Sequence, residues 1–275
     1  MAQRMVTFTT DFGLTDHYVG TMKAVIYNIN PTAHIVDICN SVQSYDVLDG
    51  AITIAQAYHY FPSETLHLVV VDPGVGSSRR PLLVTGDRHI FLAPDNGVLS
   101  FVYEREERIS VRHITSEHYF LQPVSQTFHG RDVFAAIAGW MSKGVETEKF
   151  GDEITDYVRF AAPKPKPMGD HAFKGIVLKV DKFGNLITNI REQDVPQLFQ
   201  EPTPAFRLVV GKAEINKLKT AYAQGTPGEV FAIVGSMGYL EIATNRGTAA
   251  RVCGADKGSE VGLTLGEAQP AVSAG

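Results

Sequence analysis

The sequence is poor in cysteine, with only Cys39 and Cys253 among 275 residues. These two residues lie far apart and lack a metal-like spacing, which excludes a disulfide scaffold and a cysteine-based zinc site. Long hydrophobic runs are also missing, since stretches such as Leu68–Val71 are far too short to cross a bilayer. The first residues turn polar too soon for a signal peptide. From these absences we expect a soluble cytoplasmic protein that does not bind a membrane.

Clusters of lysine and arginine are absent as well. The chain has 25 lysine and arginine residues against 30 aspartate and glutamate residues, which gives a net charge of −5. A surface that follows the phosphates of a nucleic acid is therefore not expected. The chain does have 44% apolar residues, enough to bury a sizeable core, and its length favours one large domain or two modest ones.

The first half of the sequence alternates short apolar segments with segments of helical periodicity. Tyr18–Asn28 and Asp46–Tyr58 carry apolar residues at helical spacing, and a further helix is predicted over Asp132–Lys143. The predicted strands are Val6–Thr10, Ile35–Ile38, Leu66–Val71 and Ile90–Ala93. This alternation predicts an α/β domain over residues 1–162, with a mostly parallel sheet that is covered on both faces.

The pattern changes at the segment APKPKPMGD, where prolines alternate with lysines. We interpret residues 163–172 as an extended, proline-rich linker. Short strands separated by turn residues follow it, which predicts a smaller all-β domain over residues 173–266, built as an antiparallel barrel. Residues 267–275 are predicted to form a disordered tail.

Polar side chains follow the predicted strands of the first half. Asp11 and Asp16 come after the first strand, at the carboxyl end, where open α/β sheets bind ligands. A carboxylate at that position can accept hydrogen bonds from both hydroxyls of a ribose. The simpler interpretation is that each is a turn residue or a helix cap, and for Asp16 this is the stronger of the two.

Asp72 ends the most hydrophobic predicted strand, and the glycines after it allow a tight loop that returns Arg79 towards it. This pair either belongs to a site or only fixes the loop. His129 comes just before a predicted helix, whose exposed N–H groups would lower the pKa of the imidazole. Asp95 and Asn96 follow another strand, where they either line the same cleft or form an Asx turn.

The second half offers a smaller set of polar and aromatic side chains in its predicted hairpins. Phe183 could stack on a base while Asn185 reads its edge, although Phe-Gly-Asn is also ordinary turn chemistry. Asp181 precedes them in the same turn, and Ser236 and Asn245 belong to the last hairpin. Each of these residues is structural in the simpler interpretation.

Six segments taken together resemble one family, the S-adenosylmethionine hydroxide adenosyltransferases, which are relatives of the fluorinase and chlorinase enzymes. They run in order from Thr9 to Gly247 and cover nearly the whole chain. The segments are TTDFGLTDHYVG, VVDPGVGSSRR, FLAPDNG, TFHGRDVF, VDKFGNLITNI and GYLEIATNRG. No single segment is decisive, but six in order are highly specific.

The resemblance implies a role for each candidate residue. Asp72, Arg79 and His129 match an Asp–Arg–His triad that handles the attacking water. Asp11 matches the carboxylate that holds the ribose hydroxyls, and Asp16 lies near the amino-acid end of the substrate. The remaining substrate contacts implied are Phe128, Asp181 at the methionine ammonium, Phe183, Asn185, Ser236, and Tyr222 and Asn245 near the adenine.

The resemblance also implies the reaction, which is hydrolysis of S-adenosyl-L-methionine to adenosine and L-methionine by in-line attack at the ribose C5′. Because the departing thioether is neutral, no metal is needed, and S-adenosylmethionine is the substrate rather than a cofactor. Family members combine an α/β domain with a β-barrel and assemble as homotrimers, with active sites shared between subunits.

Two other functions compete with this hypothesis. A nucleoside-binding module would sense S-adenosylmethionine without turning it over, and it would need the ribose and base contacts but not the triad. A metal-dependent phosphohydrolase would instead use Asp11, Asp72, Asp95 and His129 as ligands, and a chelator would abolish its activity.

Overall fold

The computed structural model describes residues 4–266, which form two compact units. The first unit extends to Ala162, and the second begins at Pro163. Among the described residues, no helix is both long and apolar enough to cross a membrane. The tail predicted over residues 267–275 lies outside the described residues.

A six-stranded sheet forms the centre of the first unit, in the order β2-β1-β3-β5-β4-β6. Strand β1 is parallel to β2 and β3, and β3 is parallel to β5, as the alternating sequence pattern predicted. Strand β4 is antiparallel to both of its neighbours. The strands are β1 (Met5–Thr10), β2 (His34–Cys39), β3 (Leu66–Val70), β4 (Pro81–Thr85), β5 (Ile90–Pro94) and β6 (Ser110–His113).

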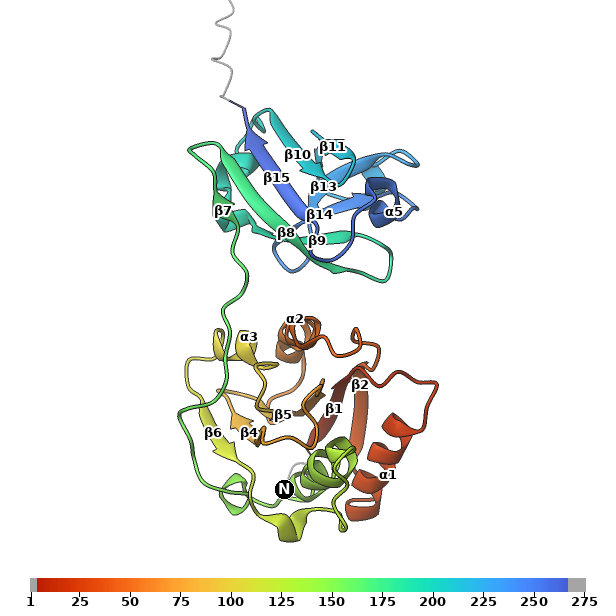
Figure 1. Ribbon diagram of the computed structural model, residues 1–275, viewed down its shortest axis with the longest axis vertical. Coiled ribbons are helices and arrows are strands. Elements are labelled where there is room, and N and C mark those ends of the chain that lie inside the picture. Colours follow the sequence, from red (N-terminus) through yellow and green to blue (C-terminus); the bar gives the residue numbers. More distant parts are fainter. Residues whose placement is uncertain (1–3, 267–275) are drawn as a thin grey trace, which may run out of the picture. The chain divides into compact units, whose positions relative to one another are not determined.

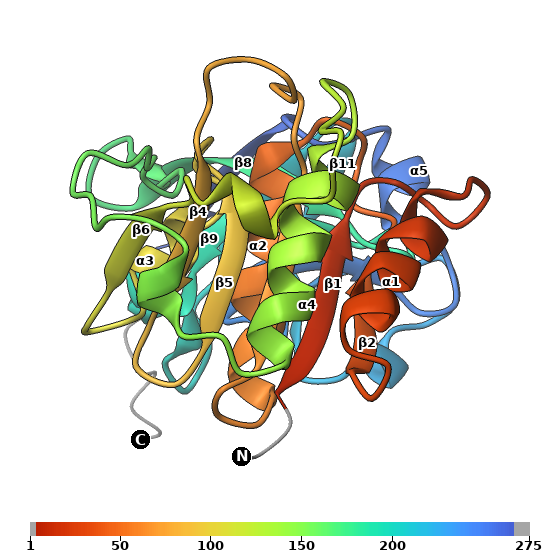
Figure 2. The same ribbon diagram turned by 90° about the horizontal axis from the view of Figure 1, so that it is seen from below.

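Helices cover both faces of this sheet. Successive residues of a strand point to opposite faces, so Leu66 and Leu68 pack into one apolar cluster while Val69 and Val71 pack into another. Helices α1 and α4 belong to the first cluster and lie together on one face, with α2 on the other (Figure 2). The helices are α1 (Tyr18–Ile29), α2 (Val47–Ala57), α3 (Ser100–Tyr103) and α4 (Ala136–Ser142).

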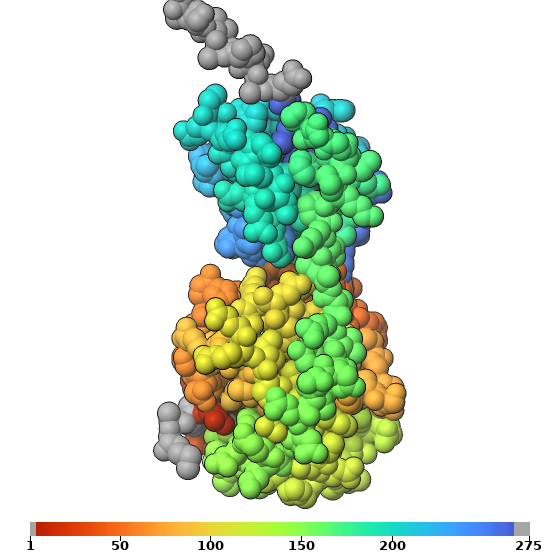
Figure 3. Space-filling view, turned by 90° about the vertical axis from the view of Figure 1, so that its left-hand side faces the viewer, coloured from red at the N-terminus to blue at the C-terminus, as the bar shows by residue number. Residues whose placement is uncertain are grey.

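The helix predicted over Asp132–Lys143 differs from the observed one at its start. A π-helical segment, η3 (Gly130–Ala135), precedes α4, and His129 is its N-cap residue. The other short helices of this unit are the 3₁₀ turns η1 (Tyr58–Tyr60), η2 (Glu117–Tyr119) and η4 (Thr147–Lys149). After η4 the chain runs over the surface of the unit (Figure 3), where Val158 N–H donates to Asp95 and Phe160 N–H donates to Ser100.

A curled, mostly antiparallel sheet forms the second unit (Figure 1). Its strands follow the order β11-β10-β15-β8-β9-β14-β13-β12, with β7 paired to β8. The strands are β7 (Lys166–Pro167), β8 (Ala172–Val180), β9 (Leu186–Arg191), β10 (Phe206–Val210), β11 (Ala213–Ile215), β12 (Leu218–Lys219), β13 (Val230–Val234), β14 (Tyr239–Thr244) and β15 (Glu260–Leu265).

The prediction of an all-β antiparallel barrel is correct for the hairpins but not in full. The path of hydrogen-bonded strands has two ends, β11 and β12, so it forms an open half-barrel. Strand β12 is parallel to β13. The unit also contains one short helix, α5 (Ala249–Cys253), and the 3₁₀ turns η5 (Glu192–Asp194), η6 (Pro196–Phe199) and η7 (Tyr222–Gln224).

Candidate active site

Two carboxylates mark the carboxyl ends of adjacent strands in the first unit. Asp11 follows β1 directly, and Asp72 lies two residues after the end of β3. Because β1 and β3 are parallel neighbours, both side chains lie at the same edge of the sheet. Burial raises the pKa of Asp11, with a smaller contribution from the negative charge of Asp72, while the Tyr45 N–H opposes the shift.

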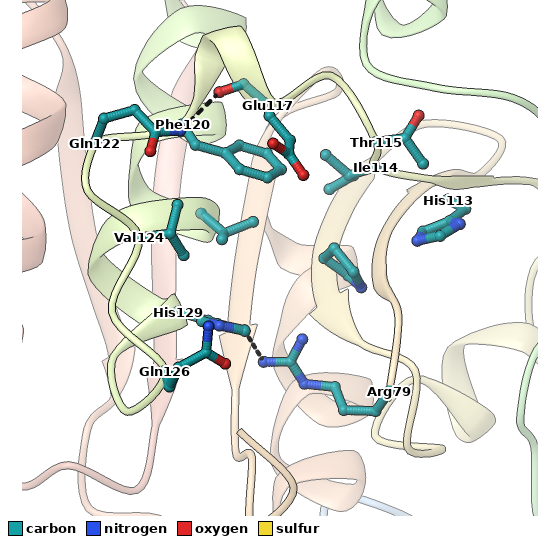
Figure 4. Close-up of a pocket in the computed structure, with 12 residues that line it drawn as sticks. Arg79, His113, Ile114, Thr115, Glu117, Phe120, Gln122, Val124, Gln126 and His129 are labelled. Carbon is teal, nitrogen blue, oxygen red and sulfur yellow. Dashed lines mark hydrogen bonds between the residues drawn. The ribbon is translucent and has the colours of Figure 1, made fainter. Parts of the chain in front are cut away.

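Asp72, Arg79 and His129 form a continuous chain of hydrogen bonds. The Arg79 Nε atom donates to both carboxylate oxygens of Asp72, at 3.0 and 2.9 Å, and Nη2 donates to Oδ2 at 2.5 Å. The same Nη2 atom donates to Nδ1 of His129 at 2.8 Å (Figure 4). The Arg79 and Asp72 side chains are only 8% and 4% exposed, so this ion pair is shielded from solvent. The structure therefore brings together the three residues that the family resemblance implied as a triad.

The contact with Arg79 determines the protonation of His129. A guanidinium can only donate hydrogen bonds, so Nδ1 must accept, and a neutral ring then carries its proton on Nε2. The pKa of His129 is lowered, as expected from the sequence, but the cause differs. Burial is the main cause and the positive charge of Arg79 adds to it, whereas the prediction had relied on the helix N-terminus.

The loop between β3 and β4 delivers Arg79 to Asp72. Gly76 lies in the left-handed region at φ 77°, and a Cβ atom there would collide with the carbonyl oxygen of Gln126. The Ser77 hydroxyl closes the turn by donating to the carbonyl oxygen of Gly74 at 2.6 Å. This close approach places the Arg79 loop against the segment that leads into His129.

A buried acidic residue anchors that segment. Asp132 is fully buried and accepts hydrogen bonds from the Ser125 N–H, at 2.8 Å, and from the Arg131 guanidinium. Arg131 also lies over the ring of Phe128, which is buried against Phe12. These contacts fix the residues on both sides of His129, and π-helical segments of this kind occur frequently at functional sites.

Asp11 has a partner that the sequence did not indicate. The Tyr45 N–H donates to Oδ2 of Asp11 at 2.8 Å, and Tyr45 lies at φ 64°, a conformation that is rare for tyrosine. Its side chain is 76% exposed. No sequence signal predicts a tyrosine at positive φ, so this residue was missed. Asp16 is exposed in the loop between β1 and α1, which also contains Asp11. It is not the cap of the helix, because the N-cap residue of α1 is His17.

Asn96 forms the Asx turn of the simpler interpretation, whereas Asp95 pairs with an arginine instead. Asn96 Oδ1 accepts from the Val98 N–H, which is the Asx turn, and Asn96 Nδ2 donates to the carbonyl oxygen of Val71. Asp95 accepts from the Arg80 guanidinium at 2.9 Å. Among residues 4–266, no group of three histidine, cysteine, aspartate or glutamate side chains is arranged to hold a metal ion.

The second unit has a pocket of about 590 Å³, lined by Asp181, Phe183, Asn185 and Tyr222. Phe183 is 76% exposed there, so its ring is available for stacking. Asp181 also holds the turn, because its oxygens accept from the N–H groups of Phe183 and Asn185 and from Asn185 Nδ2. Sequence reasoning missed Arg246, which lines the same pocket at φ 54°.

Two of the residues predicted in the second unit lie outside this pocket, and Tyr222 contacts a buried glutamate. Ser236 and Asn245 do not line this pocket, and Asn245 Nδ2 donates to the carbonyl oxygen of Gly225 at 2.7 Å. Tyr222 donates to Oε2 of the buried Glu241 at 3.0 Å. Burial raises the pKa of Glu241, and burial together with the Glu241 charge raises that of Tyr222 to about 12.

Comparison with known proteins gives consistent matches over both units. The SAM hydroxide adenosyltransferase N-terminal domain matches residues 6–151, and the C-terminal domain of the same family matches residues 175–262. The (R)-S-adenosyl-L-methionine hydrolase of Salinispora tropica is 33% identical over 265 residues, which cover 95% of this chain and 98% of the relative. A fluorinase of Nocardia brasiliensis is 26% identical over 95% of this chain and 97% of its own length.

A solved structure is similar as well. The crystal structure of an uncharacterized conserved protein from Thermotoga maritima has a TM-score of 0.86 and 37% sequence identity. The similarity covers 94% of this chain and 100% of that protein.

Proposed function

The chain belongs to the SAM hydroxide adenosyltransferase family, as its six sequence segments predicted, and we propose on that premise that it hydrolyses S-adenosyl-L-methionine to adenosine and L-methionine. The name of the Salinispora tropica relative supports this reaction. The observation that carries the proposal is the hydrogen-bonded chain of Asp72, Arg79 and His129 at the carboxyl edge of the sheet. No metal or cofactor takes part in the proposed reaction.

The nucleophile is the difficult partner in this reaction. Attack at the ribose C5′ releases a neutral thioether, which needs no general acid. Water has a pKa of about 15.7, whereas that of histidine is about 6.5, so prior deprotonation by an ordinary histidine would cost about 12 kcal/mol. The lowered pKa of His129 makes this cost larger. The proton therefore leaves as the C–O bond forms.

The hydrogen bonds suggest a role for each member of the triad. With Nδ1 occupied by Arg79, neutral His129 offers an N–H group at Nε2 and acts as a donor. Arg79 adds a permanent positive charge, so these two residues stabilise the developing hydroxide. Asp72 is then the proton acceptor, since a carboxylate offers about four lone-pair sites and Arg79 makes three contacts to it.

Substrate contacts complete the proposal. Asp11 holds the ribose hydroxyls, with Asp16 towards the amino-acid end and Phe128 supporting the loop beside them. In the second unit the adenine stacks on Phe183, and the residues Asp181, Asn185, Tyr222, Ser236 and Asn245 supply further contacts. Assembly as a homotrimer, with sites completed by a neighbouring subunit, belongs to the same proposal.

Product analysis in ¹⁸O-labelled water tests the reaction. Purified protein should convert S-adenosyl-L-methionine to equal amounts of adenosine and methionine, with one ¹⁸O atom in the 5′-hydroxyl of adenosine by mass spectrometry. Unlabelled adenosine would refute attack of water at carbon. Tight binding of S-adenosyl-L-methionine by calorimetry, with no product after prolonged incubation, would instead identify a non-catalytic sensor.

A further inference from the structure

The loop that carries Asp72 and Arg79 joins two strands that are not neighbours in the sheet. It leads from β3 to β4, and β5 lies between these two strands. Because β5 is parallel to β3 and antiparallel to β4, the carboxyl end of β5 lies between the two ends of the loop. Asp95 and Asn96 follow β5 directly, so they stand at the point that the loop crosses.

Asn96 fixes the end of the loop that bears Asp72. Its Nδ2 atom donates to the carbonyl oxygen of Val71 at 2.8 Å, and Val71 directly precedes Asp72. Its Oδ1 atom accepts from the Val98 N–H at 3.1 Å, so the amide group is held at both of its polar atoms. Because a peptide group is planar, fixing the Val71 carbonyl also fixes the orientation of the Asp72 N–H.

Asp95 fixes the other end of the loop, through the residue that directly follows Arg79. Its N–H donates to the carbonyl oxygen of Arg80 at 2.8 Å, and its Oδ2 atom accepts from Arg80 Nε at 2.9 Å. The second carboxylate oxygen, Oδ1, accepts from the Val158 N–H at 2.7 Å. The Asp95 side chain is only 4% exposed, so this set of contacts is shielded from solvent.

The Asp72–Arg79 pair cannot determine its own position in the site. Its hydrogen bonds fix the two side chains to each other, but the chain between them contains Gly74 and Gly76, which leave the backbone conformationally free. In the proposed reaction the pair must act on a water aligned with a ribose that Asp11 holds at the end of β1. Its position relative to the sheet therefore depends on contacts at the two ends of the loop.

We propose that Asp95 and Asn96 are positioning residues for the Asp72–Arg79 pair. They act through the residues that flank the pair and set its position relative to the sheet. The inference rests on the proposed hydrolysis, in which a displacement of about 1 Å can cost about 100-fold in rate.

Asn96→Asp tests the Asp72 end of the loop with a side chain of the same shape. Aspartate keeps an oxygen for the Val98 N–H, but it loses the Nδ2 donor and turns its second oxygen towards the carbonyl oxygen of Val71. We expect kcat to fall by about 10- to 100-fold, with an unchanged KM for S-adenosyl-L-methionine because the proposed substrate contacts are intact. Asn96→Ala removes the same donor without adding a charge and should lose at least as much.

Asp95→Asn tests the other end of the loop. The backbone hydrogen bond to the Arg80 carbonyl remains, whereas the charged contact to the guanidinium is lost. The fall in kcat should therefore have the same direction as in Asn96→Asp and be smaller, again with an unchanged KM.

Asn30→Asp is the matched control. Asn30 follows α1 in the same unit, where its Nδ2 donates to the Ser142 hydroxyl at 3.0 Å and its Oδ1 accepts from the Thr32 N–H at 3.2 Å. The substitution again removes a donor and keeps an acceptor, but at the opposite edge of the sheet from Asp72, where the chain leads into β2. Urea unfolding followed by Trp140 fluorescence should show a loss of stability, while kcat stays at the wild-type value.

NMR of the Arg79 Nε–H group reports the position of the pair without any turnover. In the wild-type protein this N–H lies against both carboxylate oxygens of Asp72, so its ¹⁵N-correlated signal should be protected from exchange, and Arg79→Lys identifies it by its loss. The signal should shift or broaden in Asn96→Asp and in Asp95→Asn, and it should be unchanged in Asn30→Asp.

A lower kcat at an unchanged KM, together with an altered Arg79 signal, supports the proposal. Wild-type kcat in both Asn96 variants overturns it, and so does an equal fall in Asn30→Asp, which would assign the effect to a general loss of stability. A fall in Asn96→Asp with wild-type kcat in Asn96→Ala would assign the effect to the added charge, which also overturns the proposal.

The remaining outcomes are also decisive. Should Asn96→Ala not fold, the two variants of unchanged shape, Asn96→Asp and Asp95→Asn, decide through kcat and the Arg79 signal. Failure of the hydrolysis itself is recognised separately, because the wild-type protein would then form no labelled adenosine in the product assay. The Arg79 signal still answers the structural question in that case, and an unchanged signal in Asn96→Asp and Asp95→Asn would overturn the positioning of the pair.

Discussion

His129 has two hydrogen-bonding functions in the proposed mechanism, and glutamine can reproduce both. The side-chain oxygen of glutamine can accept from Arg79 while its NH₂ group donates to the nucleophile, but glutamine cannot act as a base at neutral pH. His129→Gln should therefore retain kcat to within about tenfold, whereas His129→Ala should lose about 10²–10³-fold. Steady-state kinetics of the two variants measures the difference.

A general-base role for His129 gives a different pattern. Both variants would then lose activity to the same extent, since neither side chain can take up a proton. An equal loss of substrate affinity in the two variants, with kcat preserved, would instead indicate a purely structural histidine.

At the residue scale, the sequence was informative about which residues meet and less so about how they meet. The pairing of Asp72 with Arg79 followed from the tight loop after a strand, and the resemblance to the family implied that His129 joins them. The choice of Nδ1 as the acceptor followed from neither, because it depends on how two separate loops pack. Tyr45 was missed for the same reason, since its positive φ is imposed by the surrounding structure.

The loop from Asp72 to Arg79 is the element on which the site depends, and Gly76 is its critical position. Gly76→Ala should destabilise the first unit for two reasons. Positive φ costs an L-residue about 1–2 kcal/mol, and the collision with Gln126 should add about 1–3 kcal/mol. Urea unfolding followed by the fluorescence of Trp140, which is the single tryptophan and lies in α4, measures the free energy of unfolding of this unit.

Gly13→Ala is the matched control for this variant. Gly13 lies at φ 70°, and the nearest atom to a Cβ there would be 4.0 Å away, so only the conformational cost applies. The excess destabilisation of Gly76→Ala over Gly13→Ala therefore measures the contact between the two loops. Equal values for the two variants would show that the loop can move away from Gln126 without loss.

Elements of strong periodicity were predictable, and those defined by their neighbours were not. Helices α1 and α2 and the parallel strands β1, β2, β3 and β5 have clear apolar patterns and lie close to their predicted bounds. Strand β4 contains a short buried apolar run, Leu82–Val84, that was not predicted as a strand, whereas β6 has a single buried residue and lacks an apolar pattern of its own. Strand β4 pairs with β5, and β6 pairs with β4, so these hydrogen bonds define the two strands.

At the scale of the whole molecule, the first unit has a further histidine of lowered pKa at the opposite end of the central strand from Asp72. His67, near the start of β3, is fully buried, and its Nδ1 lies 2.7 Å from the Thr7 hydroxyl. Its Nε2 lies 3.3 Å from Nδ1 of His89. Burial, with a smaller contribution from His89, lowers the pKa of His67 to about 3. The pKa values of His89, His113 and His129 are lowered as well, so acid acts on this unit through several histidines, and His67 is the fully buried one in the core.

The core group predicts how stability depends on pH. An unfolded chain binds a proton at His67 below pH 6.5, while the folded state resists it down to about pH 3. Stability is thus fully present above pH 6.5 and is lost as the pH falls, by about 2 kcal/mol between pH 8 and pH 5. His67→Asn removes this titration, so the free energy of unfolding, followed by Trp140 fluorescence, should fall less over the same range. His34→Asn, at an exposed position, should keep the wild-type slope. An unchanged slope in His67→Asn would mean that other groups cause the acid sensitivity, and that His67 is protonated at little cost in the folded state.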